Sequence, residues 1–293
     1  MGTATSEESI RVTRMTSHFV GRIEGLDLRQ PLTPEQAARV RKEIAEHGVL
    51  VFPGQHLDDD QQLRVIQVFG PAKRTSFAVT KNDNDYLIDI TNVDKEGRLL
   101  PYNDSTAMFM RANLQWHADG SYNELPHRVT TLNARELPDL PPPTEYADTR
   151  AAWEALPAAR QRELEGLVVE HDRAWSLAKA GLKPGDLSAD AERRFAHQPL
   201  VRTNAITGRK SLYIGSHASH IVGRPLEEGR ALINELVAHA TQPEFVYSHR
   251  WQLHDLVAWD GSLTMHRATP YDAPHGRRLR QGGATEPTPL LAA

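Results

Sequence analysis

Short strand-like runs are scattered along the chain, and they never settle into a regular alternation with helices. Each run is rich in β-branched, aromatic or aliphatic residues, which is typical of strands. The runs are Val49–Phe52, Tyr86–Val93, Arg128–Ala134, Leu212–Ile214, Phe245–Trp251, Leu256–Trp259 and Arg277–Gln281. A doubly wound parallel sheet requires sustained alternation of strand and helix. The pattern therefore favours a mainly β fold with flanking helices, either a barrel or a jelly roll.

Helices are predicted at about residues 34–47, 58–70, 149–170 (interrupted at Pro157) and 226–240. The first of them has the clearest signal. Thr33 and Gln36 have the spacing of a capping box, and Pro34 suits the first helical position. We expect this helix to end at Gly48.

The chain shows no internal repeat and is interpreted as one domain over residues 11–283. A long, irregular insertion is expected at about residues 150–200, because its second half is polar and contains Gly, Pro and Asp. Residues 1–10 are predicted to be a polar tail, and residues 284–293 a C-terminal tail.

Composition excludes several kinds of chemistry and partner. The chain has no cysteine, which rules out disulfides, thiolate zinc sites, iron–sulfur clusters and a cysteine nucleophile. Its formal net charge of −4 lacks the basic excess of a general nucleic-acid binder. No apolar run approaches the roughly 18 residues of a membrane span, and the polar N-terminus is unlike a secretory signal. We therefore expect a cytoplasmic protein without nucleic-acid or membrane partners, and assembly into a homo-oligomer stays open.

The 14 histidines leave metal chemistry open, and one short motif stands out. His117 and Asp119 are two residues apart, so on a strand both side chains point to the same face. A second histidine, His266, follows the strand at 256–259 and a turn. Two histidines and one carboxylate on one face of an ion form the facial triad of non-haem Fe(II) oxygenases. Alternatively, His117 and Asp119 lie in a solvated loop, and His266 is a buried histidine bonded to a backbone carbonyl.

A basic segment follows His266. If this segment is a strand, Arg277 and Gln281 share one face with Leu279, while Arg278 and Arg280 lie on the opposite, solvated face. An inward Arg277 offers a planar fork for a carboxylate. The hydroxyl of Thr144, after the proline-rich loop, is a candidate second donor to that carboxylate.

These motifs together resemble the taurine/2,4-dichlorophenoxyacetate dioxygenase family of Fe(II)- and 2-oxoglutarate-dependent oxygenases. The resemblance runs from about residue 18 to 281. The resemblance to the family rests on Trp116-His117-x-Asp119-x-Ser121-Tyr122, Thr144, Asp148–Trp153, Trp259-Asp260, Met265–Arg267 and Arg277. The phenoxyacetate branch looks nearest, and the likeness to it is densest in Leu200–Thr203, Gly208–Ile214, His217–His220 and His239–Tyr247.

The resemblance implies a double-stranded β-helix, a cupin-like jelly roll with the metal inside. It implies that His117, Asp119 and His266 bind Fe(II), while Arg277 and Thr144 hold the distal carboxylate of 2-oxoglutarate. His217 and His220 match histidines that help to hold an aromatic acid in the phenoxyacetate enzyme.

Two positions depart from the family pattern. Gly261-Ser262 stands where Asn-Arg is usual, so the turn before His266 is expected to be looser. Gln281 stands where many members carry a second arginine, which holds the substrate anion in the sulfonate branch. Gln281 is therefore a candidate substrate residue, and the anion must be caught by something else.

The expected activity is O₂- and 2-oxoglutarate-dependent hydroxylation of a small organic acid, with succinate and CO₂ as coproducts. The resemblance to the phenoxyacetate branch implies an aryloxyalkanoate as the substrate. Hydroxylation at its ether carbon would give a hemiacetal that collapses to a phenol and an oxo-acid. The alternatives are a sulfonate or another small acid as substrate, a jelly-roll metal-dependent hydrolase or isomerase, and a non-catalytic jelly-roll binding module.

Overall fold

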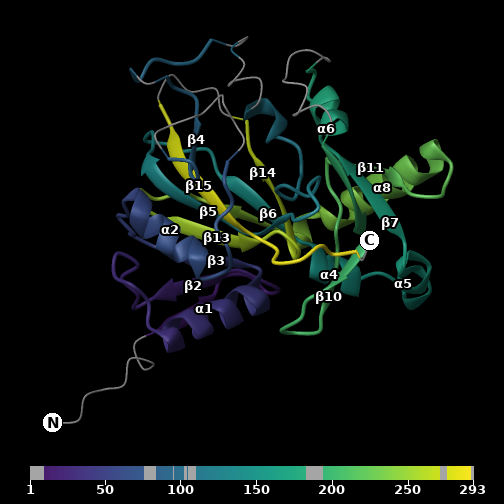
Figure 1. Cartoon of the computed structure of the whole chain (residues 1–293), viewed down its shortest axis with the longest axis horizontal. Coiled ribbons are helices and arrows are strands. Elements are labelled where there is room, and N and C mark those ends of the chain that lie inside the picture. The colour runs from purple at the N-terminus through teal and green to yellow at the C-terminus, as the bar shows by residue number, and fades with distance from the viewer. Residues whose placement is uncertain are drawn as a thin grey trace.

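The computed structural model describes residues 10–75, 84–94, 96–101, 104, 110–182, 194–270 and 276–291. Two sheets face each other in the middle of the molecule (Figure 1). In order, the main sheet contains β1 (Arg11–Arg14), β2 (Gly21–Glu24), β3 (Val49–Phe52), β13 (Leu256–Asp260), β5 (His127–Glu136), β15 (Arg278–Thr285) and β4 (Ile88–Thr91). The minor sheet contains β12 (Val246–His249), β6 (Thr144–Asp148) and β14 (Thr264–Ala268). The predicted mainly β fold with flanking helices is confirmed.

Strand β3 shows why the sequence favours a sandwich with helices on one outer face. Val49 and Val51 point between the sheets, where they pack with Tyr146 of the minor sheet. Leu50 and Phe52 point outward and pack beneath helices. A strand covered on both faces is apolar throughout, since its side chains alternate between two buried environments.

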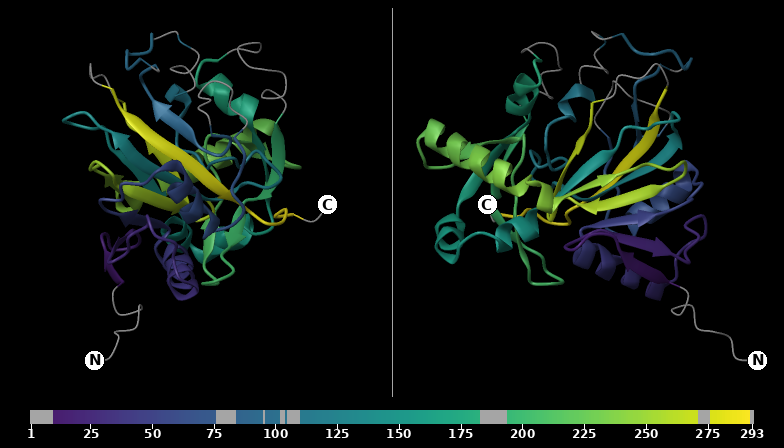
Figure 2. Two further views of the ribbon diagram at one scale, coloured as in Figure 1. Left: turned by 60° about the vertical axis from the view of Figure 1, so that its left-hand side comes forward. Right: turned by 180° about the vertical axis from the view of Figure 1, so that it is seen from behind.

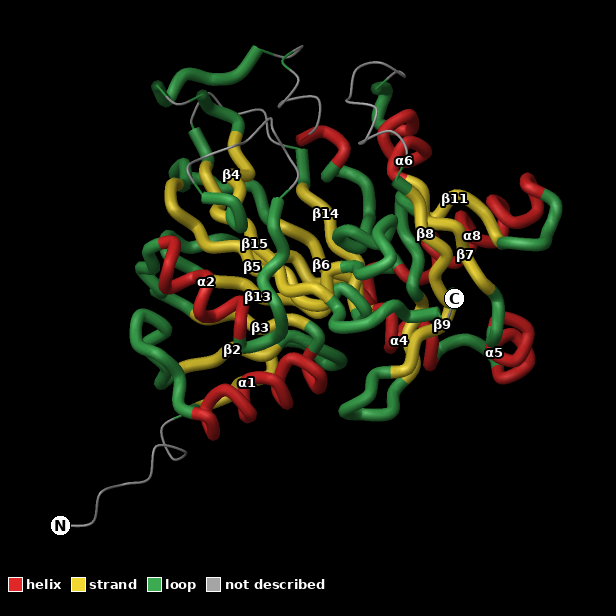
Figure 3. Tube along the Cα trace, in the orientation of Figure 1, coloured by secondary structure: helices red, strands yellow, loops and turns green. Residues whose placement is uncertain are grey.

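Helices α1 (Pro34–His47) and α2 (Asp59–Gln67) cover the outer face of the main sheet (Figure 3). The capping box predicted for α1 is present: Thr33 accepts from the backbone of Gln36, whose side chain accepts from the backbone of Thr33. Gly48 ends this helix with a φ of +71°, a conformation that glycine adopts at little cost.

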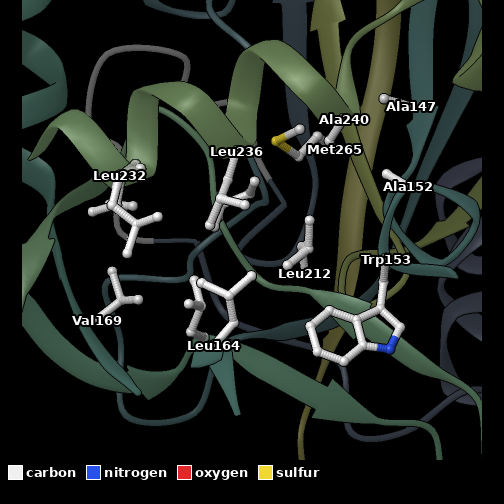
Figure 4. Close-up of a cluster of buried hydrophobic side chains, with 14 of the residues drawn as sticks. Ala147, Ala152, Trp153, Leu164, Val169, Leu212, Leu232, Leu236, Ala240 and Met265 are labelled. Carbon is white, nitrogen blue, oxygen red and sulfur yellow. The ribbon is translucent and has the colours of Figure 1, made fainter. Parts of the chain in front are cut away.

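A second region, here called the helical module, packs on the outer face of the minor sheet. It contains α4 (Thr149–Glu154), α5 (Ala158–Leu164), β7 (Val168–Asp172), α6 (Arg173–Lys179), β8 (Phe195–Pro199), β9 (Val201–Thr203), β10 (Lys210–Leu212), β11 (Ala218–Ile221), α8 (Leu226–Ala240) and the short 3₁₀ helix η1 (Pro243–Phe245). Its apolar core includes Trp153, Leu164, Leu212 and Leu236 (Figure 4). Ala147 of β6 and Met265 of β14 belong to the same cluster, which joins the module to the sandwich. Figure 2 shows the module beside the sheets from two further directions.

Several boundary predictions need correction. The insertion predicted as irregular at about 150–200 contains helices and strands, and β7, β8 and β11 form a sheet of their own. Strand β7 replaces the end of the helix predicted to reach residue 170. The C-terminal tail predicted from residue 284 begins inside β15, because this strand runs to Thr285. The predicted N-terminal tail, apart from Ile10, lies outside the described residues.

Candidate active site

A cavity lies between the two sheets and is closed on one side by the helical module. Leu132 and Leu279 line it from the main sheet, and Thr144 and His266 from the minor sheet. Ser176 of α6 and His217, next to β11, line it from the module. The three candidate metal ligands therefore lie in the space that the jelly roll encloses.

His117 and His266 are held side by side by their own backbones. The backbone N–H of His117 donates to the carbonyl of His266 at 3.0 Å, and the N–H of His266 donates back at 2.9 Å. Residue 117 thereby extends the minor sheet by one antiparallel bridge beyond β14. Gly215 lies against the backbone of His117 with a φ of +131°, where an added Cβ would come within 3.0 Å of the His117 Cα.

The three side chains present their donor atoms to one point. One candidate ligand atom from each of His117, Asp119 and His266 lies within 4.8 Å of the other two. The Nε2 atoms of His117 and His266 are 3.7 and 3.6 Å from the two carboxylate oxygens of Asp119. The Nδ1 of His117 lies 2.7 Å from the carbonyl of Gln115. A carbonyl can only accept, so Nδ1 carries a proton and Nε2 is the ring atom that can bind a cation.

The electrostatics of this cluster suit a divalent ion. Burial would raise the pKa of Asp119, but His266 and His117 outweigh it and lower that pKa to about 2. Burial lowers the pKa of His266 to about 3. At neutral pH Asp119 is thus an ionised carboxylate and His266 a neutral imidazole, the protonation states that metal ligands require. In the described part of the chain, the buried Oδ2 of Asp119 has no hydrogen-bond donor, and a cation would satisfy it.

Arg277 and Thr144 line the same cavity, as the predicted carboxylate site requires. Arg277 is 9% exposed and directly precedes β15, where its backbone N–H donates to Oδ1 of Asn92 at 2.8 Å. Thr144 begins β6, and its Oγ1 accepts from Nε1 of Trp251 at 3.0 Å. Since that hydroxyl is used as an acceptor, its own proton remains to be donated to a carboxylate.

The prediction of which side chains share a face in the segment after His266 is fully correct only for the inner face. Leu279 and Gln281 line the cavity with Arg277, as expected. The prediction of a solvated outer face is correct for Arg278, whose side chain pairs with Glu136 and is 43% exposed. It is wrong for Arg280, whose largely buried guanidinium pairs with Asp59 and Asp89, because helix α2, which begins at Asp59, packs over this face of β15.

The two candidate substrate histidines have different locations. His217 lines the cavity, with its ring 4.8 Å from that of Tyr122 and its Nδ1 2.8 Å from Oγ of Ser176. Burial, more than any neighbouring charge, lowers the pKa of His217, so its ring is neutral. His220 is not among the residues that line the cavity; it lies on β11, beside Ser219 and near Glu170 of the neighbouring strand β7. The predicted substrate contact is therefore corrected for His220.

Sequence reasoning missed several polar residues of the cavity. Lys73, Arg173 and Arg194 line it, as do Tyr122 and His127. Tyr122 belongs to the motif around His117, and this motif was the one local signal that could have indicated its place in the cavity. The three basic residues sit in segments with no recognisable motif, and only the fold brings them together.

The chain matches the family described as "Taurine catabolism dioxygenase TauD, TfdA family" over residues 11–282. It is 39% identical over 271 residues to the alpha-ketoglutarate-dependent 2,4-dichlorophenoxyacetate dioxygenase of Burkholderia sp. (strain RASC), covering 90% of each chain. It is 33% identical over 235 residues to the (S)-phenoxypropionate/alpha-ketoglutarate-dioxygenase of Sphingobium herbicidovorans, covering 78% of each chain.

Among solved structures, the fold is similar to that of AAD-2 in complex with Mn(II) and N-oxalylglycine. The TM-score is 0.88 at 38% sequence identity, over 97% of this chain and 99% of AAD-2. This agreement in sequence and fold extends through both sheets and the helical module. The chain therefore belongs to the TauD, TfdA family of dioxygenases, the Fe(II)- and 2-oxoglutarate-dependent oxygenases that its motifs resemble.

Proposed function

We propose that the protein is an Fe(II)- and 2-oxoglutarate-dependent dioxygenase that hydroxylates an aryloxyalkanoate at its ether carbon. The proposal rests chiefly on the buried cluster of His117, Asp119 and His266 in the same cavity as Arg277. Relatives that act on 2,4-dichlorophenoxyacetate and (S)-phenoxypropionate support the substrate class. Family membership favours an oxygenase over the metal-dependent hydrolase or isomerase and over the binding module.

In this proposal His117, Asp119 and His266 hold Fe(II), which with 2-oxoglutarate and O₂ supplies the oxidant that hydroxylates a C–H bond. The guanidinium of Arg277 binds the distal carboxylate of 2-oxoglutarate as a fork, and the Thr144 hydroxyl donates to it. These contacts fix the cosubstrate relative to the ion. The apolar walls contributed by Leu132 and Leu279 exclude water from the reaction.

The proposed reaction consumes one molecule each of O₂, 2-oxoglutarate and substrate. One O₂ oxidises two molecules: 2-oxoglutarate becomes succinate and CO₂, and the substrate gains a hydroxyl. The hydroxylated ether carbon of an aryloxyalkanoate is a hemiacetal, which releases a phenol and leaves an oxo-acid. The protein's contribution is to place this carbon next to the ion, on the side of the cavity that the module covers.

The test is 2-oxoglutarate consumption with Fe(II) and O₂, in the presence of a panel of acids. We expect 2,4-dichlorophenoxyacetate to stimulate succinate formation and to release an equal amount of phenol. Taurine should stimulate it less, because Gln281 offers no charge for the sulfonate. Strong stimulation by taurine with no response to any aryloxy acid would overturn the substrate class.

We propose a small-molecule acid as the partner, without nucleic-acid or membrane partners, and a cytoplasmic location. None of the helices in the described residues is both long and apolar enough to cross a membrane. Assembly into a homo-oligomer stays a prediction, which light scattering of the purified protein would test.

A further inference from the structure

Hydrogen bonds join the segment that carries the metal ligands to the helical module. The backbone N–H of Ser216 donates to the carbonyl of Trp116 at 2.7 Å. The side-chain Nε2 of Gln115 donates to the carbonyl of Ser176, in α6, at 3.1 Å. The first bond joins two backbones, so it does not depend on side chains. The second depends on the residue at position 115.

Gln115 contacts a metal ligand with its other end. Its backbone carbonyl lies 2.7 Å from Nδ1 of His117, and this contact fixes the orientation of the imidazole. A single residue therefore holds both the ring of His117 and helix α6. Gln115 is not among the residues that line the cavity, so it acts on a substrate only through the groups that it holds.

Helix α6 forms part of the cavity wall on the module side. Arg173, Ser176 and Leu177 line the cavity, and their spacing places them on one face of the helix. The bond from Gln115 reaches the last four carbonyls of α6, which lack regular intrahelical donors. The backbone N–H of Ala180 also reaches the Ser176 carbonyl, at 3.2 Å. Gln115 therefore ties the C-terminal end of this wall to the metal-binding segment.

A second set of contacts runs from the same helix residue back toward the metal ligand. Oγ of Ser176 donates to the carbonyl of Arg173 at 2.8 Å, so it accepts from Nδ1 of His217, also at 2.8 Å. The ring of His217 lies edge to face with that of His117, at 6.0 Å between their centres. With Gln115, these residues form a closed ring of contacts, which holds α6 at a set distance from His117.

This distance matters for an oxygenase that oxidises a substrate lying against α6. A misplacement of about 1 Å can cost a positioned reaction about 100-fold in rate. Consumption of 2-oxoglutarate and attack on the substrate are separate steps, so a misplaced substrate need not stop the first. A shift of α6 should therefore appear as succinate formed without hydroxylated product.

We propose that Gln115 is a positioning residue that sets the location of the prime substrate relative to the ion by tying α6 to the segment of His117. This inference rests on the proposed function, because it requires a substrate bound between α6 and the metal site. Gln115 touches neither substrate nor ion, and its effect is on how efficiently 2-oxoglutarate consumption leads to product.

The experiment compares Gln115→Met, which keeps the length of the side chain and removes its donor, with Gln115→Lys, which keeps a donor. Gln161→Met is the matched control, because Nε2 of Gln161 donates to the carbonyl of Trp153 at 2.9 Å elsewhere in the module. Hydrogen exchange of the backbone amides of α6 is measured on the protein without metal or substrate.

The second measurement is the ratio of phenol released to succinate formed, with Fe(II), 2-oxoglutarate, O₂ and 2,4-dichlorophenoxyacetate. Unfolded molecules form neither product, so this ratio does not depend on the fraction of the protein that is folded. A loss of stability alone would leave it unchanged.

We expect Gln115→Met to speed exchange of the α6 amides by about fivefold, the value of one neutral hydrogen bond. The ratio of phenol to succinate should fall by about two- to fivefold. Fe(II) affinity should not change, because the backbone carbonyl that holds His117 is retained. Gln115→Lys should keep most of the wild-type ratio. An unchanged ratio or unchanged exchange in Gln115→Met, or an equal fall of the ratio in Gln161→Met, would refute the role of Gln115.

The design separates this inference from the proposed substrate class. If taurine drives 2-oxoglutarate consumption in the wild type and aryloxy acids do not, the substrate class is wrong. The ratio is then measured as taurine consumed per succinate formed. A lower ratio in Gln115→Met would still support Gln115 as a positioning residue, and an unchanged ratio would overturn it.

Discussion

The two sides of the cavity are built in different ways. On the sandwich side, His266 and Thr144 sit on paired strands, and His117 is bonded to the backbone of His266. On the module side, Ser176 comes from a short helix, and His217 and Arg194 lie just outside strands. Strand pairing fixes a side chain through several backbone hydrogen bonds, whereas helix ends and loops tolerate change more readily. The contrast suggests that the sandwich determines the reaction and the module determines which acid enters.

The largest expected effect is on the sandwich side. His117→Ala or Asp119→Ala should abolish both Fe(II) binding and turnover, because two remaining protein ligands should not retain the ion. Calorimetric Fe(II) titration checks this, with His254→Ala as a control, since His254 stacks on His56 outside the cavity. Unchanged Fe(II) affinity in His117→Ala would contradict the assignment. Affinity in the wild type should also fall as the pH approaches 3, because the pKa of His266 is lowered to about 3 and a protonated imidazole cannot bind the ion.

The next largest effect concerns the cosubstrate. Arg277→Ala should raise the KM for 2-oxoglutarate by roughly two to four orders of magnitude, because removing one member of a buried charge pair costs about 3–5 kcal/mol. The KM for the prime substrate should change far less. Arg278→Ala is the matched control, because Arg278 faces outward toward Glu136. Equal behaviour of the two variants would show that the roles of the two faces of β15 are assigned wrongly.

The pH dependence of stability tests the helical module through His171, a histidine that is not a metal ligand. Burial lowers the pKa of His171 on β7 to about 3, and its Nδ1 lies 2.9 Å from Oγ of Ser121. The folded pKa lies below the unfolded value of about 6.5, so the unfolded chain alone binds a proton as the pH falls. Between pH 7 and 5 this should remove about 2 kcal/mol of the free energy of unfolding.

His171→Gln should lose less stability over that pH interval than the wild type does. Urea unfolding of the chelator-treated proteins at both pH values measures the difference. An identical loss in the two proteins would mean that His171 is not held neutral in the fold.

The smallest effect concerns substrate choice on the module side. His217→Ala should raise the KM for the aryloxy acid by roughly fivefold, because a neutral hydrogen bond contributes about 1 kcal/mol. The KM for 2-oxoglutarate should stay the same. His220→Ala, a histidine three residues away that does not line the cavity, is the control. If His217→Ala altered Fe(II) binding instead, the division of labour between the two sides would be wrong.

Local signals explain what the sequence predicted well. The capping box of α1 involves residues three apart, and the run Val49–Phe52 is apolar because both faces of β3 are covered. The His117–Asp119 motif is equally local, so the ligand cluster could be anticipated. Strand β7 could not be anticipated, because only three residues separate Val168–Asp172 from the end of helix α5. Its strand geometry comes from pairing with β8 and β11, which lie later in the chain.

The same reasoning applies to the cavity. Lys73 carries no motif, and its neighbours Gly283 and Arg194 are far away in the sequence. Gln281 drew attention only as a departure from the family pattern. A missing charge can be read from the sequence, but the basic residues that line the cavity come together only when distant segments fold.

The backbone bridge between His117 and His266 has a consequence for how the enzyme acquires and loses its iron. The two residues are far apart in the chain, and the entropy of closing the loop between them is spent when the sheet forms rather than when the ion arrives. The apoprotein should therefore keep a folded, ready binding site. Iron that is lost through oxidation or chelation can be replaced without refolding, so activity should return as fast as fresh Fe(II) reaches the cavity.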